Sequence, residues 1–423
     1  MEKLPKVVEE KIEAICGHLG GRPKLAKMFR QCFPNTLETT TELEEDGTTY
    51  VFTGDIPAMW LRDSTAQVRH YVPLAREDGD LQRIIEGLIR RQIAYVKIDP
   101  YANSFNREAN GNHYTADQPD PGPWVWEQKY EIDSLCYPLQ LSYLYWKATR
   151  RNEIFDADFR QMVEQIIALW KLEQRHGVES PYRFQRPDCP PSDTLTRGGL
   201  GEPVGDTGMT WSGFRPSDDA CQYGYLIPSN MFAVVVLGYV EEIAREVYND
   251  GELAEKAEGL KDEIDEGIRD FGLYEHPEFG TIYAYETDGR GHYNLMDDAN
   301  VPSLLSIPYL GYVPADDPIY RNTRNFVLSP HNPYYYEGKH ARGIGSPHTP
   351  EGYIWPISLS MQGLTSNDRE ERDELIDMLE RTDADTCFMH EGFDPDDPMQ
   401  FTREWFAWAN SLFGEFVVRW YEG

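Results

Sequence analysis

The chain has 423 residues, of which 72 are acidic and 40 basic, giving a formal net charge of −32 at pH 7. This negative charge argues against nucleic acid or an anionic membrane as a partner and favours a neutral one. The composition, 40% hydrophobic and 13% aromatic, excludes a disordered chain. Because the sequence contains no Ser-rich, Gly-rich or charged linker, we expect a single domain over residues 1–423.

The amino-terminal segment MEKLPKVVEEKIEAIC interleaves charged and apolar residues at helical spacing. It has no apolar run of the length of a signal or membrane segment, so we expect a cytoplasmic protein. The cysteines are scattered without close pairs, which favours free thiols over a disulfide framework. They are Cys16, Cys32, Cys136, Cys189, Cys221 and Cys387.

Two kinds of helical segment are predicted along the chain. Residues 81–89, 159–170 and 253–268 have apolar side chains on one face only, whereas 232–240 and 304–310 are apolar on all sides. One-sided helices suit an outer layer, and all-round apolar helices suit an inner one. The alternation predicts an all-α fold, a ring of helical hairpins, with short strands near residues 50 and 282.

An acidic residue opens each of six segments that we interpret as entrances to inner helices. A single carboxylate before a helix is typical of a cap. Six such entrances would bring acids together at one mouth of the ring, with spacings of about 50 to 85 residues that suit one hairpin plus a variable loop. The residues are Asp63, Asp133, Asp218, Asp297, Glu351 and Glu404.

Two acids are candidates for the chemistry of glycosidic hydrolysis, which needs a proton donor and a second carboxylate. Asp218 lies in RPSDDA beside Asp219 and near Arg215. These neighbours shift its pKa in opposite directions, so the sequence leaves its protonation state open. Glu391 lies in CFMHEGF among apolar residues, and a carboxylate in a semi-buried wall favours a functional role.

Further candidate residues combine a flat aromatic face with polar groups that can grip hydroxyls. The segment GDIPAMWLRDS contains Asp55, Trp60, Arg62 and Asp63, and SPHTPEGYIW contains His348 and Glu351. A salt-bridged loop or a helix cap is the alternative for each. The loop over residues 186–216 contains five prolines, and we expect it to form one side of the pocket.

Several rival chemistries are not supported by the sequence. HEGF lacks the second histidine of a zinc-protease helix, and there is no CxxC. DPDDP lacks the glycine and the terminal glutamate of a calcium loop. The glycines between residues 198 and 205 do not have phosphate-binding or dinucleotide-binding spacing. We therefore expect no metal and no cofactor.

Read in order, GDIPAMWLRDS, WEQKYEIDSLCYP, WSGFRPSDDA, IGSPHTPEGYIWP and FMHEGF resemble glycoside hydrolase family 125 over nearly the whole chain. The resemblance implies an (α/α)6 toroid and a metal-independent exo-α-1,6-mannosidase that inverts the anomeric carbon of its neutral oligosaccharide substrate. It also implies Asp218 as general acid and Glu391 as general base. The residues that it places in the mannose pocket are Asp55, Trp60, Arg62, Asp63, Arg215, His348 and Glu351.

Two alternatives remain open at the level of sequence. Helical toroids also host sugar epimerases and isomerases that use histidines, and His348 and His390 would serve such a reaction. A non-catalytic carbohydrate-binding protein is the second alternative. The oligomeric state is left open.

Overall fold

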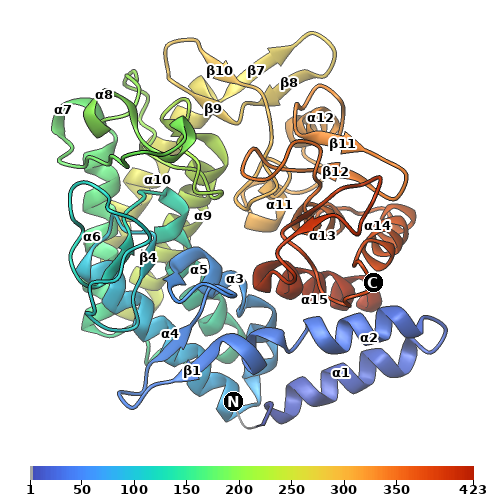
Figure 1. Ribbon diagram of the computed structural model, residues 1–423. Helices are drawn as coiled ribbons and strands as arrows, with labels where there is room; N and C mark the ends of the chain where they lie inside the picture. Colours follow the sequence, from blue (N-terminus) through green and yellow to red (C-terminus); the bar gives the residue numbers. More distant parts are fainter. Residues whose placement is uncertain (1–2) are drawn as a thin grey trace.

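The computed structural model describes residues 3–423, and its helices form two concentric rings (Figure 1). Inner helices pack side by side around the centre, with α15 against α3, α3 against α5, α5 against α9, and α13 against α15. The inner ring consists of α3 (Leu61–Ala66), α5 (Ile132–Thr149), α9 (Ile227–Ile243), α11 (Ile307–Leu310), α13 (Pro356–Leu364) and α15 (Ala407–Glu422). This all-α toroid confirms the predicted fold.

The outer ring covers the inner one. It consists of α4 (Gly79–Ile98), α6 (Ala157–Glu173), α10 (Gly251–Phe271), α12 (Pro318–Val327) and α14 (Arg369–Arg381), and α1 (Lys6–His18) and α2 (Pro23–Cys32) close it. Helix α2 packs against α14 and α15 and so joins the two ends of the chain. In α10, Leu253, Leu260 and Ile264 are buried, as the periodicity predicts, and the side chain of Asp250 caps the first turn.

Helix α9 is mainly apolar, and most of its residues are buried in the protein. Within residues 3–423 it is the one helix, extended to Tyr248, that is long and apolar enough to cross a membrane. Two thirds of that stretch is buried in the protein, as expected of a core helix. The cysteines are free, as predicted.

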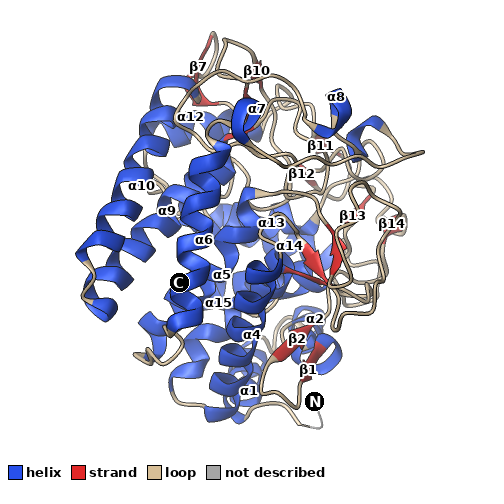
Figure 2. Ribbon diagram, turned by 90° about the vertical axis from the view of Figure 1, so that its left-hand side faces the viewer, coloured by secondary structure: helices blue, strands red, loops and turns tan. Residues whose placement is uncertain are grey.

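Short antiparallel strands and loops lie mainly on one side of the helical rings (Figure 2). The pairs are β1 (Thr41–Leu43) with β2 (Thr49–Val51), β7 (Leu273–His276) with β8 (Gly280–Tyr283), β11 (Tyr335–Glu337) with β12 (Arg342–Ile344), and β13 (Gly392–Phe393) with β14 (Phe401–Thr402). The three-stranded sheets are β3 (Met59–Trp60), β4 (Ser104–Phe105) and β5 (Val125–Glu127), and β6 (Tyr225–Leu226), β9 (Glu286–Thr287) and β10 (Tyr293–Asn294). Strands β2 and β8 occur where the sequence predicts them.

The structure differs from the expected helix boundaries in two places. The apolar stretch 304–310 is helical only from Ile307, and it ends at Gly311, whose φ of 96° stops an α-helix. Asp63 and Asp133 lie in the first turns of α3 and α5, but Asp218 lies in a turn nine residues before α9 starts at Ile227. Asp218 is therefore not a helix cap.

Candidate active site

A narrow pocket opens where the chain enters the inner helices α3, α13 and α15. Its volume is about 60 Å³. It is lined by Thr53, Ile56, Trp60, Arg62, Asp63, Pro216, Ser217, Asp218, Asn300, His348, Trp355, Glu391, Arg403, Phe406 and Trp408. Six of the nine residues singled out from the sequence are among them: Trp60, Arg62, Asp63, Asp218, His348 and Glu391.

A tight turn presents Asp218 to the pocket. The N–H of Asp218 donates to the carbonyl of Arg215 at 2.9 Å, and the N–H of Arg215 donates to the carbonyl of Asp219 at 2.8 Å. Asp218 has a φ of 66°, a left-handed conformation that costs energy for any residue except glycine and that aspartate tolerates better than most. Lys129 holds the turn by donating from Nζ to the carbonyl of Asp218 at 2.6 Å.

The guanidinium of Arg62 gathers four carboxyl groups at the floor of the pocket. Nη1 donates to Glu131 at 2.5 Å and to Asp133 at 3.3 Å. Nη2 donates to Oδ1 of Asp218 at 3.1 Å, and Nε lies 3.4 Å from Asp63. Apart from Asp218, whose side chain is 24% exposed, these groups are almost fully buried. The floor is therefore rich in acid and has one central positive charge.

Burial and charge act against each other at this floor. Burial raises the pKa of Asp63 and of Asp133 to about 6, against the lowering effect of Arg62. The pKa of Glu131 is raised well above its usual value by burial. For Asp218, burial alone would raise the pKa, but Arg62 and a hydrogen bond with Glu131 hold it well below its usual range.

Glu391 reaches the pocket from the base of the β13–β14 hairpin. Its N–H donates to the carbonyl of Thr402 at 3.3 Å, which brings it opposite Arg403. The Nε of Arg403 donates to Oε1 of Glu391 at 3.1 Å. The neighbouring His390 stacks on Phe401 with ring centroids 3.9 Å apart, and its two ring nitrogens contact backbone carbonyls. These contacts with the hairpin and the backbone stabilise the β13–β14 hairpin, and His390 does not line the pocket.

His348 adds a positive charge at the rim. Its Nδ1 lies 3.7 Å from Oδ1 of Asp219, the residue after the candidate acid. Burial opposes charge on the imidazole, but Asp219, Asp218 and Glu391 together raise the pKa of His348 to about 9. The imidazole is therefore protonated at neutral pH beside the two candidate acids.

Aromatic side chains form the remaining walls of the pocket. They are Trp60, Trp355, Phe406 and Trp408, which come from elements far apart in the chain. Trp355 donates from Nε1 to Thr349 at 2.8 Å and is thereby fixed in orientation. Flat apolar faces next to charged hydrogen-bonding groups are suited to a sugar ring.

Three of the residues implied by the resemblance do not line this pocket. Asp55 is exposed and pairs with Arg403. Arg215 is buried and donates from Nε to Glu286 at 2.6 Å, which anchors the turn that carries Asp218. Glu351 is exposed. The loop 186–216 contributes its last residue, Pro216, to the pocket.

Other residues of the site were not predicted. Arg403 and Asn300 line the pocket, and Glu131 and Asn103 lie beneath it. Glu131 stands two residues before Asp133 in EIDSLCYP, a segment predicted to enter an inner helix, so its place at the start of α5 was the available signal. Arg403 directly precedes Glu404, one of the six acids predicted to open an inner helix, and this place before α15 was its one signal.

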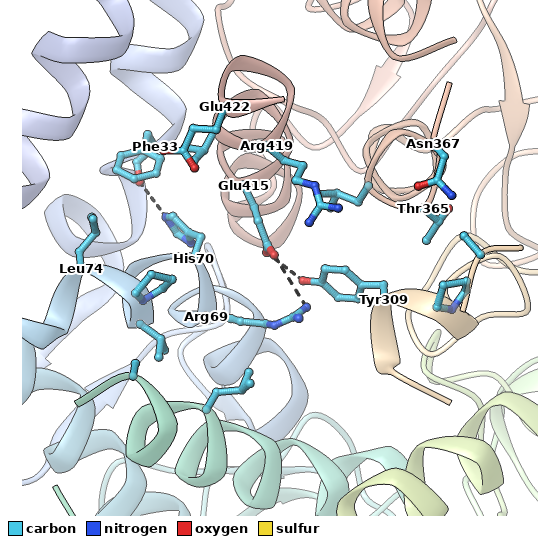
Figure 3. A pocket seen from close by; sticks show the side chains of 18 of the residues that line it. Phe33, Arg69, His70, Leu74, Tyr309, Thr365, Asn367, Glu415, Arg419 and Glu422 are labelled. Carbon is cyan, nitrogen blue, oxygen red and sulfur yellow. Dashed lines mark hydrogen bonds and ion pairs between the residues drawn. The ribbon is translucent and has the colours of Figure 1, made fainter. Parts of the chain in front are cut away.

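A wider cavity, of about 820 Å³, lies near the carboxyl ends of α5, α13 and α15 (Figure 3), and it shares no lining residue with this pocket. Glu415, one of three acidic residues that line it, accepts a hydrogen bond from Tyr309 at 2.8 Å and lies 3.9 Å from Arg69. Within residues 3–423 no group of three or more His, Cys, Asp or Glu side chains is placed to hold a metal ion. The pocket with Asp218 and Glu391 is the candidate active site.

Comparison with known proteins adds to this geometry. Residues 22–418 match the family described as metal-independent α-mannosidase (GH125). The meiotically up-regulated gene 157 protein of Schizosaccharomyces pombe is 40% identical over 98% of this chain and 85% of its own length.

Among solved structures, a metal-independent α-mannosidase of Streptococcus pneumoniae is 50% identical, with a TM-score of 0.96 over 99% of this chain and 98% of its own. That structure is a non-productive complex with α-1,6-mannobiose. A GH78 rhamnosidase of Bacillus sp. GL1 is 14% identical, with a TM-score of 0.56 over 93% of this chain and 34% of its own, so it shares the fold alone.

Proposed function

Because the chain belongs to the metal-independent α-mannosidases of glycoside hydrolase family 125, we propose that it removes non-reducing terminal α-1,6-linked mannose from oligosaccharides with inversion. The protein is a glycoside hydrolase, so the epimerase and the non-catalytic alternatives are not retained. The α-1,6 linkage is proposed from the mannobiose bound by the pneumococcal protein. Because the pneumococcal protein's family is described in connection with the processing of N-linked glycans, we propose fragments of N-glycans as the natural substrate.

The observation that best supports this proposal is that Asp218 and Glu391 line one pocket, each held by its own arginine. No hydrogen bond joins the two carboxyl groups in the described part of the chain, and they reach the pocket from separate turns. An inverting enzyme needs its two carboxyl groups on the order of 6.5 to 9.5 Å apart, so that a water molecule fits beside the sugar.

In the proposed mechanism Asp218 protonates the glycosidic oxygen while Glu391 takes a proton from water that attacks the opposite face of the sugar. Arg62 and Arg403 orient the two acids. The buried floor of four carboxyl groups closes the pocket behind the sugar, which favours removal of one terminal residue over cleavage within a chain.

Incubation with α-1,2-, α-1,3- and α-1,6-mannobiose, followed by proton NMR, tests the function. We expect cleavage of the α-1,6 isomer with β-mannose as the first anomer released. Release of α-mannose first would overturn inversion. Preference for another isomer would overturn the proposed linkage, and failure to cleave any of them would overturn the proposed substrate class.

A further inference from the structure

One positive charge at the pocket floor faces more acids than it can neutralise. Four carboxyl groups lie within 3.4 Å of the guanidinium of Arg62: those of Asp63, Glu131, Asp133 and Asp218. Burying an unpaired carboxylate costs so much free energy that the group keeps a proton instead. The cluster must therefore retain protons at neutral pH.

Glu131 and Asp218 are paired more closely than the other members. The two terminal nitrogens of Arg62 bind one each, at 2.5 and 3.1 Å. The amide of Asn103 faces both, at 3.5 Å from Glu131 and 3.3 Å from Asp218. The two carboxyl groups are also within hydrogen-bonding reach of each other. Since two carboxylates cannot hydrogen-bond to each other, one of them must carry a proton.

We propose that Glu131 is a positioning residue that shares one proton with Asp218 and so keeps the general acid loaded. The proposal rests on the proposed function and deepens it. When the substrate binds, the shared proton resides on Asp218 and passes to the glycosidic oxygen as the C–O bond breaks. The pair is left with one more negative charge, and a proton from solvent restores it.

The charges around the pair are consistent with this sharing. They come from Arg62 and Asp63 on α3, Asp133 on α5, Glu127 and Lys129 before α5, and His348 with Asp219 at the rim, while burial keeps the thiol of Cys221 neutral. Asp63 and Asp133 contact Arg62, and the charge of Asp218 acts on both. Glu131 contacts the arginine and is also hydrogen-bonded to the acid. If the shared proton is lost, two adjacent anions remain and repel each other. This repulsion makes the loss unfavourable, so the pair keeps its proton up to a higher pH.

The variant Glu131→Gln tests the proposal because it keeps the shape of the side chain and removes its proton-binding group. In the pair Glu131 holds the last proton to a high pH, because burial and the charge of Asp218 raise its pKa, whereas Asp218 alone beside Arg62 ionises at a lower pH. We expect the alkaline limb of kcat/KM against pH, measured on α-1,6-mannobiose, to move to lower pH by a unit or more, with the acidic limb in place. Hydrolysis of dinitrophenyl α-mannoside, whose leaving group needs no acid, should change less than threefold. Asp133→Asn, which removes another partner of Arg62, should shift the limb less.

If Glu131→Gln leaves the alkaline limb in place, or lowers the rate equally on α-1,6-mannobiose and on dinitrophenyl α-mannoside, the proposal is overturned. Glu131 would then have a structural role. Infrared titration gives a readout independent of activity. We expect the protonated-carboxyl band at neutral pH to lose the same intensity in Glu131→Gln as in Asp218→Asn, because either change removes the one shared proton, and an unchanged intensity in Asp218→Asn would overturn the pairing. If the wild type cleaves no mannobiose, the proposed function fails while the infrared comparison still decides the pairing.

Discussion

Arg403 donates its Nε proton to Oε1 of Glu391 at 3.1 Å, across the base of the β13–β14 hairpin. The same guanidinium pairs with Asp55, so it is held from two sides. Within the described part of the chain, Oε2 of Glu391 accepts no hydrogen bond. Oε2 is therefore available to accept a hydrogen bond from a water molecule, and the contact of Arg403 with Oε1 orients the carboxylate toward that water.

Replacement of Arg403 by glutamine should lower kcat with little change in KM, because the base would lose its orientation. A hydrogen bond to a charged group contributes about 1.5 to 3 kcal/mol, so we expect a loss of about 10- to 100-fold. Arg403→Lys should fall between this variant and the wild type. Steady-state kinetics on α-1,6-mannobiose measure both. A rise in KM alone would mean that Arg403 binds the sugar instead of positioning Glu391.

Glu391→Gln and Asp218→Asn should each lower kcat by about 10²- to 10⁴-fold, the usual contribution of one general acid or base. Both variants should still bind α-1,6-mannobiose, which isothermal titration calorimetry measures. Asp397→Asn is the matched control, since Asp397 is exposed in the loop of the same hairpin, and it should stay within twofold of the wild type. Wild-type turnover by Asp218→Asn would exclude Asp218 as the acid.

The helical ring could be predicted from the sequence because the burial of a helix is reflected in the spacing of its apolar residues. Residues 253–268 have one apolar face and α9 has apolar residues all round, and these patterns separate an outer helix from an inner one. The short α11 could not be predicted, since hydrophobicity alone does not show where Gly311 adopts its positive φ. The spacing of apolar residues therefore predicts whether a helix is inner or outer better than it predicts where the helix begins and ends.

Pocket residues could be predicted only where residues that are neighbours in the sequence also point into the pocket. Arg62 and Asp63 are adjacent in sequence and both reach the floor. Arg215, three residues before Asp218, turns away to Glu286 because the chain reverses between them. The pairing of Glu391 with Arg403 depends on hairpin register, which a sequence pattern does not specify.

Two glycines in inner helices should respond oppositely to alanine. A Cβ on Gly363 of α13 would lie 2.1 Å from Cζ of the buried Phe416, so Gly363→Ala should reduce the free energy of unfolding by about 1 to 3 kcal/mol. A Cβ on Gly238 of α9 would meet nothing within 4 Å. Gly238→Ala should therefore stabilise the protein by about 0.5 to 1 kcal/mol. Urea unfolding compares them, and equal destabilisation would contradict the packing at α13.

His348 should make stability fall as pH rises above neutrality. Its pKa is about 9 in the folded protein, against about 6.5 for an unperturbed histidine, because Asp219, Asp218 and Glu391 outweigh the effect of burial. Below pH 6.5 the folded and unfolded chains both carry the proton, and the stabilisation is complete. Between pH 6.5 and 9 the unfolded chain releases the proton while the folded chain keeps it, so the stabilisation is progressively lost.

In His348→Gln this dependence should disappear. The difference in free energy of unfolding between wild type and variant should be largest at pH 6 and should shrink steadily towards pH 9. Urea unfolding at pH 6, 7.5 and 9 measures it. Asp219→Asn removes the nearest carboxylate, 3.7 Å from Nδ1, and should weaken the same dependence while leaving the imidazole in place. A difference that stays constant across these pH values would show that the carboxylates at the rim do not hold His348 in its charged form.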